Sequence, residues 1–217
     1  MLEYKRNQIE EAISGALEPS THEPTSELRT RLKRLLDADR AAGRTTRSSD
    51  PELANYAFYS AEPPGSGIEV WFSEYEAFAL LNGLRLMEHG WPQGFAVSVL
   101  RRVRVDLEMQ HARILKLDGK ALFDQEAIRR SAQPGDIWFD NTAPVLLTIV
   151  SRAGKAPLAQ RGLLDCAIRE GPAAAMKWIR ETGGLAYAFT MFELVSVAFE
   201  LARRLAQTEP RLRGRST

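Results

Sequence analysis

The sequence predicts an α+β protein of two units, from two patterns in its apolar residues. In most of the first hundred residues they recur every three or four positions, which is typical of amphipathic helices. After residue 144 they form β-branched and aromatic runs bounded by glycine and proline, which is typical of strands. We therefore expect a mainly helical domain with a β-hairpin over residues 1–117 and a small α+β domain over residues 118–217.

Two helices open the chain in this prediction. The first covers residues 2–17, and the proline-containing run PSTHEPT (residues 19–25) ends it. Thr25 or Ser26 then caps a second helix. Asp39 projects onto the apolar stripe of this helix, so we expect the helix to end shortly before Gly43. That stripe consists of Leu28, Leu32, Leu35 and Leu36.

A hairpin and two more helices complete the first unit. The short runs Tyr56–Tyr59 and Ile68–Phe72, separated by PPGSG, predict two paired strands. Ser73 with Glu76 three residues later is a capping-box pattern and begins a third helix. Gly90 supplies the left-handed residue that ends this helix. A fourth helix follows from Gln93.

The second unit contains three strand-like runs and two helices. PVLLTIVSR (residues 144–152), LLDCAIREG (163–171) and LAYAFTMF (185–192) predict strands, and PAAAMKWIRETGG (172–184) predicts a helix. The last helix, about residues 191–207, is apolar outside one narrow polar stripe and needs cover on most of its circumference. A second copy of the chain could supply that cover, which predicts a homodimer through residues 191–207. The alternative is a central helix in the core of the monomer.

Basic residues are concentrated in one stretch of the first unit. The whole chain has a net charge of 29 − 28 = +1, whereas residues 28–47 carry seven Lys and Arg against Asp37 and Asp39, or 7 − 2 = +5. Such a local patch fits a small nucleic-acid footprint. The alternative is an ordinary solvated helix face whose long side chains keep their charges in water.

The stretch GSGIEVWFSEYEAFALLNGLRLMEHGWPQGFAVSVLR (residues 65–101) resembles the wing and following helices of MerR-like winged helix-turn-helix domains. The resemblance covers roughly residues 4–104. It implies that the second helix lies in the major groove of double-stranded DNA and that the wing, with its tip at residues 63–67, contacts the flanking backbone. The residues expected at the DNA are Arg29, Thr30, Arg31, Lys33, Arg34, Arg40, Arg44 and Arg47, with Ser66 at the wing tip.

Helical projection divides these residues by expected role. Arg29, Lys33 and Arg40 share one flank of the second helix and, with Arg44 and Arg47, are expected to follow phosphates. Thr30, with Arg31 or Arg34, is then expected near base edges.

Other chemistry has little support in the sequence. The single cysteine, Cys166, fits a small core residue better than a nucleophile, and the three histidines lie far apart, so we expect no catalytic residues, metal or cofactor. We find no phosphate-binding loop and no nucleophile elbow. No apolar run is long enough to span a bilayer and the first residues do not resemble a secretory signal, which predicts a cytoplasmic protein.

These observations lead to one main functional hypothesis: a DNA-binding transcriptional regulator that acts as a homodimer through a winged helix-turn-helix, with a C-terminal dimerisation or effector domain. An alternative is a protein-interaction module that binds no nucleic acid. An enzyme is a third possibility, for which the sequence shows no catalytic constellation.

Overall fold

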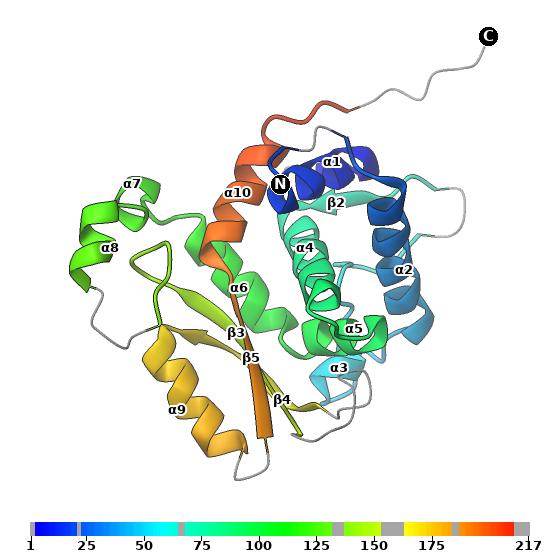
Figure 1. Ribbon diagram of the computed structural model, residues 1–217. Coiled ribbons are helices and arrows are strands. Elements are labelled where there is room, and N and C mark those ends of the chain that lie inside the picture. Colours follow the sequence, from blue (N-terminus) through cyan, green and yellow to red (C-terminus); the bar gives the residue numbers. More distant parts are fainter. Residues whose placement is uncertain are drawn as a thin grey trace.

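The computed structural model describes residues 3–20, 23–64, 68–131, 137–152, 163–183 and 187–210, and it is a mixed α+β protein with two small sheets (Figure 1). The predicted α+β class is therefore confirmed. The strands are β1 (Glu3–Lys5), β2 (Trp71–Ser73), β3 (Val145–Arg152), β4 (Leu163–Glu170) and β5 (Tyr187–Glu193). The helices are α1 (Arg6–Leu17), α2 (Ser26–Ala42), α3 (Pro51–Ala54), α4 (Glu74–Glu88), α5 (Gln93–Arg102), α6 (Arg104–Ile114), α7 (Gly119–Leu122), α8 (Gln125–Ser131), α9 (Pro172–Gly183) and α10 (Val195–Leu205).

Helix α4 lies at the centre of the core and contacts α1, α2, α5, α6 and α10. It begins at the predicted capping box: the Ser73 hydroxyl accepts from the backbone N–H of Glu76 at 3.2 Å, and the Glu76 carboxylate accepts from that of Ser73 at 2.7 Å. All side chains of residues 75–84 are buried. The helix ends before Gly90, whose φ of +88° is the left-handed conformation predicted there.

The predicted hairpin is wrong. Strand β2 pairs antiparallel with β1, so that Tyr4 lies opposite Phe72, and Tyr56–Tyr59 forms no strand. The N-terminal residues Glu3–Lys5, predicted as the start of the first helix, supply the partner strand instead.

Side chains replace the strand ladder at Tyr56–Tyr59, which explains the difference. The Asp39 carboxylate accepts from the N–H groups of Ala57 (3.1 Å) and Phe58 (2.9 Å). The guanidinium of Arg104 donates to the carbonyls of Tyr56 and Tyr59, both at 3.0 Å. These four residues are almost completely buried. Their backbone groups therefore satisfy their hydrogen bonds in the core without pairing with a second strand.

The second sheet has the strand order β4-β3-β5, with both pairs antiparallel. Leu147 and Ile149 of β3 belong to the main core, whereas Leu146 and Val150 alternate onto the opposite face, where α9 packs. The three strands and α9 lie where the sequence predicted them, within about two residues. The sheet is therefore covered by α9 on one face and by the helical core on the other (Figure 1).

Helix α10 packs beside α1 and also contacts α4 and α6 (Figure 1). It begins at Val195, later than predicted, because residues 187–193 belong to β5. Leu201 and Leu205 are buried within the chain, at 0% and 1% exposure. The apolar face of α10 thus has its cover inside one copy, which removes the reason for predicting a dimer through residues 191–207. The homodimer and the division at residue 118 stay predictions.

Buried His111 makes stability depend on pH. Its ring stacks on Phe78 with centroids 4.6 Å apart, and burial lowers its pKa from 6.5 to about 4. Between these pH values the unfolded chain protonates His111 and the folded chain does not. The free energy of unfolding should therefore fall by about 3 kcal/mol as the pH drops from 6.5 to 4, with no contribution from this residue above pH 6.5.

Urea unfolding at several pH values measures this effect in wild type and in His111→Phe, which keeps an aromatic side chain but cannot be protonated. The variant should lose the His111 part of the pH dependence. His89→Gln is the control, because His89 is exposed. Equal pH dependence in wild type and His111→Phe would contradict the assignment.

Candidate nucleic-acid interface

Helix α2 carries the basic stretch, and its ends are set by local signals. The Thr25 hydroxyl caps it by accepting from the N–H of Leu28 at 3.1 Å, as predicted. The helix ends at Gly43, whose φ is +60°, again where the sequence predicted. Its leucine stripe packs against α1, α4 and α5. The opposite side of α2 therefore faces solvent.

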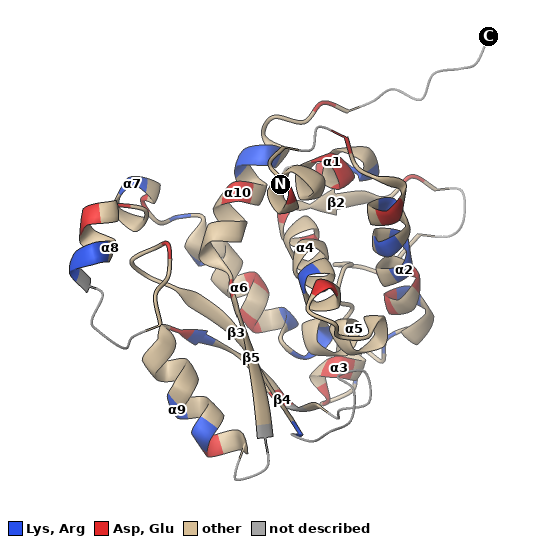
Figure 2. Cartoon of the chain, viewed as in Figure 1, with Lys and Arg blue, Asp and Glu red and all other residues tan. Residues whose placement is uncertain are grey.

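The exposed side of α2 is predominantly basic. It presents four cations, two acids (Glu27 and Asp37) and the Thr30 hydroxyl. Figure 2 shows the basic and acidic positions along α2 in blue and red. The Thr30 hydroxyl donates to the carbonyl of Ser26 at 2.8 Å, so its oxygen can still accept a hydrogen bond from the solvent side. The four cations are Arg29, Lys33, Arg34 and Arg40. The structure thus brings together most of the residues that the sequence assigned to DNA.

Other elements supply acids to some of these cations. Arg29 lies 3.5 Å from the Glu10 carboxylate of α1. Arg31 pairs with Glu27 one turn earlier in α2, at 2.7 Å. Lys33, Arg34 and Arg40 have no carboxylate within ion-pair distance in the described part of the chain. They are therefore the side chains on this face most available to a phosphate.

Arg40 and Arg44 lie over aromatic rings at the C-terminal end of the same region. The guanidinium of Arg40 is 5.9 Å from the centroid of Tyr59, and that of Arg44 is 5.3 Å from Tyr56. Arg44 also lies 3.8 Å from the Glu62 carboxylate. Burial raises the pKa of Tyr59 to about 12, so this ring stays neutral beside its arginine. Both arginines extend the basic face, with their guanidinium groups held by cation–π contacts.

The two remaining predicted residues lie in loops. Arg47 is exposed between α2 and α3. The backbone of this loop is bonded to α3, because the N–H of Thr45 donates to the carbonyl of Leu53 at 2.7 Å. Ser66, predicted at the wing tip, lies outside the described residues.

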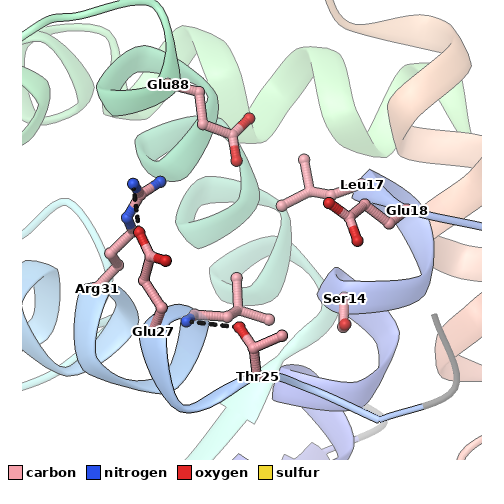
Figure 3. A pocket seen from close by; sticks show the side chains of 8 residues that line it. Ser14, Leu17, Glu18, Thr25, Glu27, Arg31 and Glu88 are labelled. Carbon is pink, nitrogen blue, oxygen red and sulfur yellow. Dashed lines mark hydrogen bonds and ion pairs between the residues drawn. The ribbon is translucent and has the colours of Figure 1, made fainter.

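A polar pocket of about 320 Å³ lies on the other flank of α2, between α1 and the end of α4 (Figure 3). Three carboxylates, those of Glu18, Glu27 and Glu88, outnumber the single guanidinium of Arg31 in its lining. Burial raises the pKa of the Glu88 carboxyl. This flank therefore suits a cation better than a phosphate. Arg31 points into it rather than along the exposed basic face (Figure 3).

Two buried arginines that the sequence pattern did not reveal anchor this region: Arg101 fixes the end of α2, and Arg104 fixes the segment Tyr56–Tyr59. Arg101 of α5 pairs with Asp39 at 2.6 Å and donates to the Gly43 carbonyl at 2.7 Å. Arg104 binds the carbonyls of Tyr56 and Tyr59. The signal that could have revealed this cluster was Asp39 itself, a carboxylate in an otherwise apolar stripe, which requires a buried partner.

Other candidate chemistry lies away from this face. Cys166 is buried, and burial raises the pKa of its thiol to about 12, which leaves it protonated and unreactive at neutral pH. Within the described ranges no three His, Cys, Asp or Glu side chains gather where they could hold a metal ion.

Comparison with protein-family models and with curated proteins finds no match to this chain. None of the helices in the part of the chain that the structure describes is both long and apolar enough to cross a membrane.

Proposed function

We propose that this chain is a DNA-binding regulator of the helix-turn-helix type, with α2 as the helix that enters the major groove. The observation that carries the proposal is the exposed side of α2, where Arg29, Lys33, Arg34 and Arg40 lie around Thr30 and outnumber the two exposed acids, Glu27 and Asp37. A groove-reading helix needs cations for phosphates and short polar side chains near base edges.

The surroundings of α2 support the same proposal. Its end is anchored by the buried Asp39–Arg101 pair, so the basic face is carried by a rigid element. Strand β2 leads directly into the capping box of α4, as the MerR-like resemblance implies.

The salt dependence of binding tests the proposal. If Lys33 and Arg40 each neutralise one phosphate, the double variant Lys33→Ala/Arg40→Ala should weaken binding to all duplexes alike. The slope of log affinity against log salt should flatten by about 1.8 per protomer, or about 0.9 for each lost contact. Fluorescence anisotropy with random duplex between low and moderate salt measures both quantities.

Arg31→Ala is the matched control for that experiment. It removes one positive charge from the same helix, but Arg31 is already paired with Glu27 in the acidic pocket. Its slope should stay close to that of the wild type. Wild-type protein that binds no duplex at low salt would refute the proposal.

A second candidate function is a protein-interaction module. Val105 and Met109 lie one turn apart on α6 and are 67% and 51% exposed. Two exposed apolar side chains at this spacing fit a small protein-docking surface. This candidate is favoured if the wild type binds no DNA and if a protein that binds the wild type no longer binds the Met109→Lys variant.

A further inference from the structure

An open groove of about 800 Å³ lies between α10 and the segment that joins α6 to α7, beside the first residue of α4. Its walls are mainly apolar. The rings of Phe123 and Phe199 meet edge to face, with centroids 5.4 Å apart. Leu115 and Ala202 complete the apolar lining. The groove can therefore take the hydrocarbon or aromatic body of a small molecule.

Three charged side chains also line the groove, and one of them is unpaired. Glu200 lies 2.6 Å from Arg203 and 2.8 Å from Arg204, so its charge is already balanced. Glu74 has no ion-pair partner among the described residues. Together with Arg204 the charges at the groove sum to zero, but of its two acids only Glu74 lacks a cation within ion-pair distance among the described residues.

The surroundings of Glu74 favour the arrival of a cation. Burial raises the pKa of its carboxyl, which means that the charged form has lost part of its hydration. An ammonium group beside it would restore a charge-assisted hydrogen bond in a partly desolvated place. Nearby aromatic rings add to the attraction for a cation. An anionic ligand would meet a like charge, and a neutral one would leave Glu74 unpaired.

We propose that this groove binds a small lipophilic monocation, with its ammonium group on the carboxylate of Glu74 and its apolar body against Phe123 and Phe199. Such a ligand would touch both α4 and α10, two elements more than a hundred residues apart in the chain. Helix α10 also packs on α1, and α1 contacts α2. The groove is therefore connected through α1 to the helix that carries the basic face. The proposal does not rest on DNA binding, and its test needs no nucleic acid.

Three probes with the same body and different head groups test the charge preference: phenylbutylamine, phenylbutanol and phenylbutyrate. Isothermal titration of the full chain at neutral pH measures their affinities. The amine should bind at least about tenfold more tightly than the alcohol, which is the gain expected from one charge-assisted hydrogen bond, and the carboxylate should bind most weakly. Equal binding of the amine and the alcohol, or no binding of the amine, would overturn the proposal.

Two variants locate the site. Glu74→Gln keeps the shape of the side chain. It should lower the affinity for the amine at least about tenfold and leave the affinity for the alcohol unchanged. Ala202→Phe should fill the groove and weaken all three probes. Glu126→Gln is the matched control, since it removes an exposed acid from the first turn of α8. Amine affinity that survives Glu74→Gln would place the cation elsewhere and overturn the assignment.

Discussion

Replacing Asp39 by alanine is expected to lower the free energy of unfolding by about 3–5 kcal/mol, the usual loss when one member of a buried ion pair is removed. Asp39 is completely buried and its partner Arg101 is 3% exposed, with 2.6 Å between carboxylate and guanidinium. The variant leaves that guanidinium without its counter-charge. It also leaves the N–H groups of Ala57 and Phe58 without their acceptor.

Urea unfolding measures this loss, and Asp37→Ala is the control. Asp37 is an acid of the same helix that faces solvent, so its removal should change stability by less than about 0.5 kcal/mol. Asp39→Ala that is no less stable than Asp37→Ala would contradict the assignment.

A double variant separates the charge from the other bonds. Asp39→Ala/Arg101→Met should recover part of the loss, because no unpaired charge remains in the core. Recovery should be incomplete, since the N–H groups of Ala57 and Phe58 and the carbonyl of Gly43 still lack partners. A double variant that loses the full sum of the two single variants would mean that the two side chains act independently.

Much of the secondary structure could be predicted because its signals are local. The capping box of Ser73 and Glu76, the cap at Thr25 and the left-handed glycines at Gly43 and Gly90 lie within a few residues of the ends they determine. Strands β3 and β4 were predictable because β-branched and leucine-rich runs are bounded by proline and glycine. Each of these signals acts through the nearest turn of backbone, so one stretch of sequence contains the whole interaction.

The segment Tyr56–Tyr59 could not be predicted in the same way. Its aromatic residues have the composition of a strand, but its hydrogen-bond partners are Asp39 and Arg104, which lie 18 to 48 residues away along the chain. No local pattern distinguishes a backbone bonded to another strand from one bonded to side chains. The partner of β2 is likewise about seventy residues distant, at Glu3–Lys5.

The candidate DNA face was predictable in position but not in its internal pairing. The solvent side of α2 follows from the leucine stripe, because a helix with one apolar face exposes the other. Glu27 and Arg31 are four residues apart, so their ion pair was visible in the sequence. The pairing of Arg29 with Glu10 was not, since it depends on how α1 crosses α2. The fold therefore decides which of the predicted cations remain available.

The variant Leu201→Glu tests whether the apolar face of α10 packs inside one chain or against a second copy. Leu201 is completely buried in one copy of the chain, so Leu201→Glu should place an unpaired charge in the core and lower the free energy of unfolding by several kcal/mol. We therefore expect a largely unfolded variant in circular dichroism. If the face were instead the interface of a dimer, light scattering would show a folded monomer.

Ala202→Glu is the matched control for Leu201→Glu, because Ala202 is the next residue of α10 and is only partly buried at the open groove. Its carboxylate can reach water, so this variant should fold and lose far less stability. The pair of variants differs only in which side of α10 receives the charge. A folded, monomeric Leu201→Glu beside a dimeric wild type would show that α10 covers a second copy, and would contradict its assignment to the core of one chain.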